Sequence, residues 1–415
     1  MPIDTYREAF SPSELRRGAT FTVFFWMLAV AAVLGHRAYA PLLLAPLFAI
    51  DWRHAYHARR STFRALEPQW LIYFSAAGVF CFYTLLSGLW SPLPSKIDWA
   101  WRFLLCFAIA PFAFHSVRYL TPAARARAAA AVAWATLAMA GLLVFEALSN
   151  AMIRQTLPPE EELVRDIISL GRGALLLSLL VWPARKIFDE QLGRPILGWA
   201  LVVVAFVPAL KLSIETNAAM LLAGGIAFGA TRLFGGGVLK VVIALALAGV
   251  WVTPLVAALF PLEAATAMLG GLPDSWVQRL HIWSRAGAEI AAHPFGGGVE
   301  YARAISRPIV PVEINGVALN TMPLHPHNLF LHIWMDLGVV GALAMSALLL
   351  CVWVACTRMA LSRSDAALFA ALVAALFATA MTEWSVWQVW RFAAVWIAII
   401  AARLATSPRS APSAF

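Results

Sequence analysis

The chain has 415 residues, of which 61% are hydrophobic and only 13% are charged, and its mean hydropathy is +0.76. Soluble domains carry about a quarter charged residues, so this composition excludes an ordinary soluble domain and indicates an integral membrane protein. The net charge of +9 does not indicate a nucleic-acid-binding protein, because the basic residues gather in the loops between apolar segments.

Apolar segments predict an all-α, polytopic membrane protein with about twelve transmembrane helices. Residues 1–18 are polar and lack a small-residue cleavage site, which predicts a cytoplasmic N-terminal segment and no removable signal peptide. Spans 1–9 are expected within 19–260, spans 10–12 within 335–405, and a frayed cytoplasmic tail at 406–415. The twelve segments are 19–35, 39–51, 70–90, 99–117, 128–148, 171–185, 196–210, 216–232, 238–260, 335–356, 366–383 and 387–405.

Basic residues predict the orientation of these spans. Alternate loops are rich in arginine, as at Arg59, Arg60 and Arg64, whereas the short loops on the other side hold few cations, among them Arg37 and Lys211. Because cytoplasmic loops carry the excess of lysine and arginine, the N-terminus is expected inside the cell.

One connection, 261–334, is much longer than the others and lies on the outer side, between spans 9 and 10. It contains a predicted helix that starts at Asp274, a glycine-rich turn (PFGGG, 294–298) and the sequence LHPHN (324–328). Connections of this length are usually functional or disordered. The tryptophans and the helical periodicity favour an ordered loop, and five of the nine histidines fall within it: His281, His293, His325, His327 and His332.

Four motifs carry a family resemblance. They are GRGALLLSLLVWP (171–183), RLHIW (279–283) followed by HPFGGG, HPHNLFLHIWMDLGVVG (325–341) and WQVW (387–390). Together they resemble the O-antigen ligase and polymerase superfamily, and they are closer to the ligases than to the polymerases. One departure is SIETNAA (213–219), where many relatives carry a Ser-Arg pair, so no role of an arginine at that place is carried over.

The resemblance implies a bacterial inner-membrane glycosyltransferase whose active site faces the periplasm, with 261–334 as a catalytic loop. The reaction it implies is metal-independent and inverting, and belongs to lipopolysaccharide biosynthesis. O-antigen polysaccharide passes from an undecaprenyl-diphosphate-linked donor to a lipid A–core acceptor. Expected partners are these two substrates and membrane lipids, without nucleic acid, and no cofactor is expected.

Such a transfer needs cations that hold the diphosphate as it leaves. Arginine suits this task because its planar fork binds phosphate through two hydrogen bonds. Arg172 begins the sixth span at the outer rim, and the resemblance supports a catalytic role over that of a snorkelling interface residue. Arg279 shares a predicted helix face with Trp276 and Trp283, at an apolar–polar boundary. The alternative for Arg279 is a cation–π contact that holds the helix at the membrane surface.

The reaction also needs a base for the acceptor hydroxyl. His327 precedes the tenth span, and the positive end of a helix favours a neutral imidazole, so His327 is the predicted base. Asn328 is expected to orient the ring or bind glycan, and His325 to bind phosphate. Lys211 and Arg391, near the outer face, are secondary substrate-binding candidates that could instead attract anionic lipid. The alternative for His327 is a helix cap.

Two further possibilities stay open. A metal site is disfavoured because His325, His327 and His332 lack the i, i+4 spacing of a zinc helix and no acidic pair stands beside them. A secondary transporter also has about twelve spans, but its polar groups lie near the bilayer midplane and its two halves are related. The two halves of this chain share no evident pattern, and its candidate residues gather at one rim.

Overall fold

We analysed a computed structural model of the chain, which describes residues 12–50, 68–93, 98–156, 163–212, 216–259, 273–314, 316–358 and 361–406. Nearly all of this part is helical, and eight described helices are long and apolar enough to cross a membrane. The prediction of an all-α polytopic membrane protein is therefore confirmed. Most of the expected N-terminal segment, the tail after Thr406 and the start of the long loop lie outside the described residues.

The eight long helices coincide with predicted spans. They are α2 (Pro12–Leu34), α5 (Pro68–Ser87), α7 (Pro122–Leu148), α9 (Leu163–Glu190), α12 (Thr216–Phe234), α13 (Gly237–Leu259), α17 (Leu329–Arg358) and α18 (Arg363–Thr382). Two further spans correspond to α6 (Asp98–Ser116) and α19 (Val389–Ala405).

The remaining two predicted spans are broken into short pieces. Residues 39–51 form only α3 (Tyr39–Leu42) and a 3₁₀ turn (Ala45–Ala49), with prolines at 41 and 46. Residues 196–210 are divided into α10 (Pro195–Val204) and α11 (Phe206–Lys211). Pro208 explains this second break, because a proline has no N–H to donate to the carbonyl four residues earlier, which belongs to the last residue of α10.

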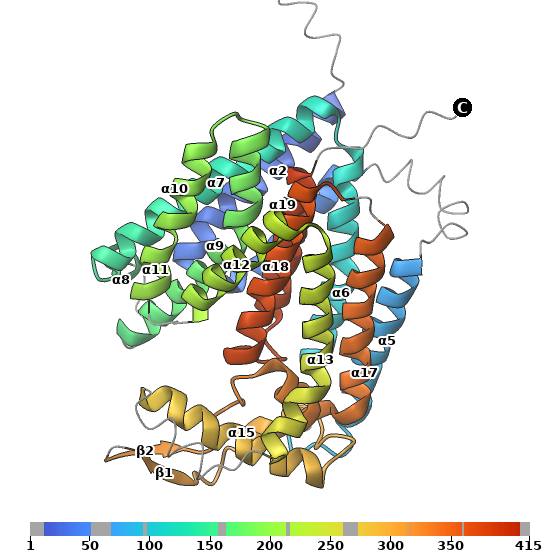
Figure 1. Cartoon of the computed structure of the whole chain (residues 1–415), viewed down its shortest axis with the longest axis vertical. Coiled ribbons are helices and arrows are strands. Elements are labelled where there is room, and N and C mark those ends of the chain that lie inside the picture. Colours follow the sequence, from blue (N-terminus) through green and yellow to red (C-terminus); the bar gives the residue numbers. More distant parts are fainter. Residues whose placement is uncertain are drawn as a thin grey trace, which may run out of the picture.

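The helices form a bundle with the long loop at one end (Figure 1). In this view α5, α17 and α13 stand beside one another, and the loop elements lie below them. These are α15 (Asp274–Ala292), the helical turn α16 (Tyr301–Ala304), and the antiparallel strands β1 (Pro311–Ile314) and β2 (Val317–Asn320). The helix predicted to start at Asp274 is therefore present. Because α18 ends at this end of the bundle, its first turn lies about 30 Å away by helical rise.

The glycine-rich turn 294–298 fits into a kink of α17. Gly338 leaves the helical conformation (φ 55°, ψ −150°), which breaks the helical hydrogen-bond pattern at this point. The N–H groups of Gly297 and Gly298 donate to the carbonyls of Met335 (2.8 Å) and Asp336 (3.0 Å). Gly296 has φ +86°, and a Cβ there would lie 2.5 Å from the Asp336 carbonyl oxygen, so a side chain does not fit. The turn thus fixes the loop against the start of α17.

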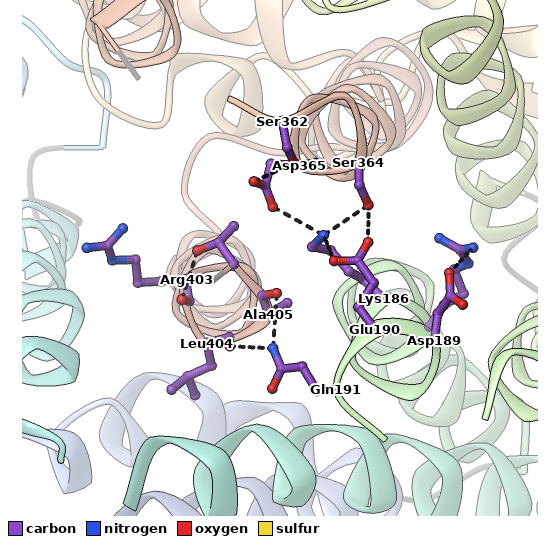
Figure 2. A network of polar contacts seen from close by, with 12 residues as sticks. Lys186, Asp189, Glu190, Gln191, Ser362, Ser364, Asp365, Arg403, Leu404 and Ala405 are labelled. Atoms are coloured by element: carbon purple, nitrogen blue, oxygen red, sulfur yellow. Dashed lines mark hydrogen bonds and ion pairs between the residues drawn. The ribbon is translucent and has the colours of Figure 1, made fainter. Parts of the chain in front are cut away.

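A polar network joins the helices at the opposite end of the bundle (Figure 2). The buried Lys186 of α9 pairs with Glu190 one turn on, and it reaches Asp365 (3.2 Å) and Ser364 (2.9 Å) at the start of α18. Gln191 donates to the carbonyls of Leu404 and Ala405, where α19 ends. The network therefore ties α9, α18 and α19 together far from the loop.

The orientation of the bundle can be tested with two exposed positions at opposite ends. A cysteine at Ala318, in β2, should react with an impermeant thiol reagent added outside the cell. A cysteine at Arg363, at the start of α18, should react only after permeabilisation, because its end is expected in the cytoplasm. The unsubstituted protein gives the background from Cys351 and Cys356, which are half-buried. If only Arg363→Cys were labelled in intact cells, the orientation of the bundle would be opposite to the predicted one.

Candidate functional site

Three elements bring an imidazole, a carboxylate and a guanidinium into one line at the loop end of the bundle. His327 precedes α17 in the left-handed region (φ 53°), and its Nδ1 lies 3.3 Å from Oε2 of Glu383. Glu383 directly follows α18, and its Oε1 lies 3.4 Å from Nη2 of Arg391 in α19. The ends of α17, α18 and α19 therefore form a His327–Glu383–Arg391 line.

The charges of this line favour an ionised Glu383. Burial raises the pKa of the Glu383 carboxyl, but the hydrogen bond with His327 and the charges of Arg391 and Arg279 outweigh it and lower that pKa below its usual value. An ionised carboxylate accepts a hydrogen bond from Nδ1–H of His327, which leaves Nε2 of the neutral ring as a proton acceptor. The geometry thus suits His327 as a base oriented by a carboxylate.

Arg391 is buried, and each of its three guanidinium nitrogens has a partner in the protein. Its side chain is 2% exposed, and its Nη1 donates to Oγ1 of Thr379 at 3.1 Å, while its Nε donates to Oε1 of Gln388. Because it also faces Glu383, Arg391 balances the carboxylate inside the protein. Its geometry supports an electrostatic role better than direct contact with a substrate.

His325 lies next to both of the other histidines near the start of α17, which their spacing in the sequence did not predict. The His325 ring centroid is 4.4 Å from that of His327 and 6.0 Å from that of His332, on which it stacks with an interplanar angle of 12°. The left-handed turn at His327 folds His325 back over the first turn of α17. Burial and the neighbouring histidines hold the pKa of His325 well below its usual value.

Asn328 caps α17. Its Oδ1 accepts the N–H groups of Phe330 (2.9 Å) and Leu331 (3.1 Å), and its Nδ2 donates to the carbonyl of Met381 at the end of α18 (3.1 Å). The side chain is completely buried. The helix cap is therefore Asn328 and not His327, and the contacts of Asn328 support a role in positioning His327 rather than in binding glycan.

Arg172 joins the site through a tryptophan. It lies on α9, half-buried, with Nη1 3.1 Å from Nε2 of His36. Its guanidinium is 6.0 Å from the Trp390 ring, over which the Arg391 guanidinium also lies, at 4.8 Å. Trp390 belongs to the WQVW motif, so this motif places Arg172 and Arg391 around one ring.

The predicted helix face of α15 is present and meets the HPHN segment. The Arg279 guanidinium lies 4.9 Å from the Trp276 ring, and Nε1 of Trp283 donates to the Pro326 carbonyl at 3.1 Å. The buried Nε of Arg279 has no hydrogen-bond partner among the described residues. The charge of Arg279 also contributes to the lowered pKa of Glu383.

An apolar cavity of about 350 Å³ opens beside Trp283 of α15. Its walls come from α13, α15, α17 and α18. They include Trp283, Leu331 and Met381, each of which is also next to the HPHN segment along the chain or through a hydrogen bond. On the other side, Val252 and Val256 of α13 are half-exposed on the outer surface of the bundle. The cavity therefore runs from the lipid-facing surface of α13 to the start of α17.

Two results differ from the sequence-based candidates. Lys211 ends α11 with an exposed side chain and makes no contact with the His327–Glu383–Arg391 line in the described part of the chain. Glu383 and His36 were not predicted. Glu383 does have a signal, because it is the only acidic residue in 366–405, at the end of predicted span 11 and four residues before the start of the WQVW motif.

Comparisons with known proteins support the family resemblance. The sequence model of the O-antigen ligase family matches residues 167–346, which include Arg172, Arg279 and His327. Putative polysaccharide ligases of Rickettsia prowazekii (27% identical over 241 residues) and Rickettsia typhi (26% identical over 241 residues) are similar to the chain. Each alignment covers 56% of this chain and 57% of the relative, so the chain spans a little over half the length of these relatives. The chain is a multi-pass membrane protein that is similar to the O-antigen ligase family over residues 167–346.

Proposed function

We propose that the protein is a metal-independent, inverting glycosyltransferase of the O-antigen ligase type. It transfers a polysaccharide from undecaprenyl diphosphate to the lipid A–core oligosaccharide at the periplasmic face of the inner membrane. The observation that supports this most strongly is an apolar cavity whose walls include Trp283 and Met381, which adjoin the segments that carry His327 and Glu383. A lipid-linked donor needs such a junction, because its tail is apolar and its reacting carbon is next to charged phosphate.

The proposed chemical step uses His327 as the base and Glu383 as its partner. Nε2 of His327 accepts the proton of the acceptor hydroxyl, and the hydroxyl oxygen attacks the anomeric carbon of the donor. The bond from that carbon to the diphosphate oxygen breaks, and the diphosphate leaves with the electron pair. Attack and departure on opposite faces invert the anomeric configuration. Glu383 holds the ring in the correct tautomer and stabilises the imidazolium that forms.

Cations stabilise the leaving diphosphate. Arg279 and Arg172 are half-buried at the loop end of the bundle, and the guanidinium of each lies beside a tryptophan ring. Arg391 is neutralised by Glu383 and acts on the same site through Trp390. We assign the diphosphate to Arg172 and Arg279, and we leave Lys211 and His325 as secondary contacts for phosphate or lipid.

Transfer by purified protein in detergent tests this proposal. Radiolabelled polysaccharide on undecaprenyl diphosphate should become linked to lipid A–core, although no closed vesicle is present. A secondary transporter gives no product under these conditions. A polymerase lengthens the lipid-linked glycan and does not need lipid A–core. The proposal would be contradicted if the label stayed on the donor, with neither lipid A–core nor the lipid-linked glycan accepting it, although the protein was fully recovered.

Replacement of Glu383 tests the carboxylate–imidazole pair. Glu383→Gln keeps the shape of the side chain but cannot stabilise an imidazolium, and it leaves the buried Arg391 without its counter-charge. We expect transfer to fall by about 10–10²-fold at matched membrane levels. Glu313→Gln, an exposed carboxylate in β1, is the control. Near-wild-type transfer by Glu383→Gln would contradict a role of Glu383 in supporting the base.

A further inference from the structure

His36 is a buried histidine outside every motif of the family resemblance. It follows α2 in a short 3₁₀ turn (His36–Ala38) and is 6% exposed. Its Nε2 faces Nη1 of Arg172 at 3.1 Å, and its ring packs edge-on against Trp390, with the centroids 4.9 Å apart. It therefore contacts both the arginine assigned to the diphosphate and the tryptophan that links this arginine to Arg391.

The protonation of His36 determines what it does for Arg172. Burial and the charge of Arg172, with smaller contributions from other arginines, lower the pKa of His36 to about 3. The ring is therefore neutral at physiological pH. Because a guanidinium has only donors, Nε2 must accept a hydrogen bond from Arg172 and the ring proton must reside on Nδ1.

This arrangement has a cost for folding. The buried Nδ1 of His36 has no hydrogen-bond partner among the described residues, and an unsatisfied buried donor destabilises a protein. A phenylalanine would make the same edge-on contact with Trp390 without that cost. Packing alone thus does not explain a histidine at this position.

A buried ion pair fixes the end of α2, directly before the turn that carries His36. Nη1 of Arg154 donates to the Leu34 carbonyl at 2.6 Å, and its Nε lies 2.8 Å from Oδ1 of Asp166. Both side chains are less than one-tenth exposed. Asp166 and Arg172 are on the same helix, α9, so this helix holds the turn at one point and meets its histidine at another. The position of His36 relative to Arg172 is therefore set by rigid contacts.

We propose that His36 is a positioning residue: its Nε2 accepts one hydrogen bond from Arg172 and thereby fixes the direction in which the guanidinium faces an anionic donor substrate. This rests on the proposed function. A long arginine side chain has many rotamers, and a fixed acceptor removes part of the entropy that binding would otherwise cost. Trp390 holds the same side chain from its ring face.

Two substitutions distinguish an acceptor from a packing group. His36→Gln keeps a hydrogen-bond acceptor but loses the aromatic contact, whereas His36→Phe keeps the aromatic contact but has no acceptor. If His36 orients Arg172, kcat/KM for the lipid-linked donor falls about tenfold in His36→Phe and much less in His36→Gln. The KM for the lipid A–core acceptor stays unchanged in both. His115→Phe, at a half-buried histidine packed 4.7 Å from Trp70 in α5, is the matched control and should keep full activity.

The double variant gives the second readout. In the Arg172→Ala background, His36→Phe should not weaken binding of undecaprenyl diphosphate to the purified protein any further, because its partner is already absent. Equal loss with and without Arg172, or greater activity of His36→Phe than of His36→Gln, would overturn the proposal and leave His36 a packing role. If the wild-type protein itself transfers no glycan, the proposed function fails and not this inference alone.

Discussion

His327→Gln is expected to reduce transfer by about 10²-fold or more at unchanged protein level, the usual loss when a general base is removed. Glutamine keeps hydrogen-bonding atoms near those of the ring, but an amide does not accept a proton at neutral pH. Because Asn328 and not His327 caps α17, the helix start should survive this change. Binding of the donor should also be largely kept, because the cations that hold the diphosphate are untouched.

The matched control for this substitution is His281→Gln. His281 lies on α15, is half-buried and makes no contact with the His327–Glu383–Arg391 line among the described residues. Its replacement should leave transfer near the wild-type rate. Both proteins should be compared by initial rates of label transfer at equal amounts in the membrane. Near-normal turnover of His327→Gln would eliminate the general base and leave His327 only a positioning role.

Arg172→Ala and Arg279→Ala are each expected to abolish measurable transfer. Removal of one group that stabilises developing charge costs about 10²–10³-fold in rate, and in the proposed mechanism each arginine supplies such a charge to the leaving diphosphate. Arg→Lys should restore activity only in part, since an ammonium lacks the planar fork that binds two phosphate oxygens. In contrast to His327→Gln, both alanine variants should also weaken binding of undecaprenyl diphosphate.

Arg194→Ala controls for the loss of an arginine as such. Arg194 is exposed at the start of α10 and lies 5.4 Å from the Trp134 ring, on helices far from the loop. We expect normal transfer from this variant. If the two site variants insert well and remain near wild-type in activity, the diphosphate is bound elsewhere, and Lys211 and Arg391 become the next residues to replace.

The sequence predicted the elements that local patterns control. The start of α15 at Asp274 and the beginning of a helix directly after HPHN follow from periodicity and capping. The tenth span was placed at 335, six residues after the true start of α17, because the polar His332 and Asp336 interrupt its apolar pattern. Prolines explain why 39–51 and 196–210 are broken, although their hydropathy alone resembles a span.

Contacts between segments that are distant along the chain could not be predicted from the sequence. The pair of His327 and Glu383 joins residues 56 positions apart, and it depends on how the turn between α18 and α19 meets the start of α17. The contact of His36 with Arg172 spans 136 positions and involves a segment outside the family motifs. Spacing rules describe neighbours on one helix, so they also failed for His325 and His332, which stack through a non-helical turn.

A structure with undecaprenyl diphosphate bound tests the account most directly. The account predicts the tail in the apolar cavity between α13, α17 and α18, and the diphosphate within hydrogen-bond reach of Arg172 and Arg279. It also predicts that Nε2 of His327 faces the side from which the acceptor hydroxyl attacks. A diphosphate bound away from these arginines, with the cavity empty of lipid, would contradict the proposed site and its mechanism together.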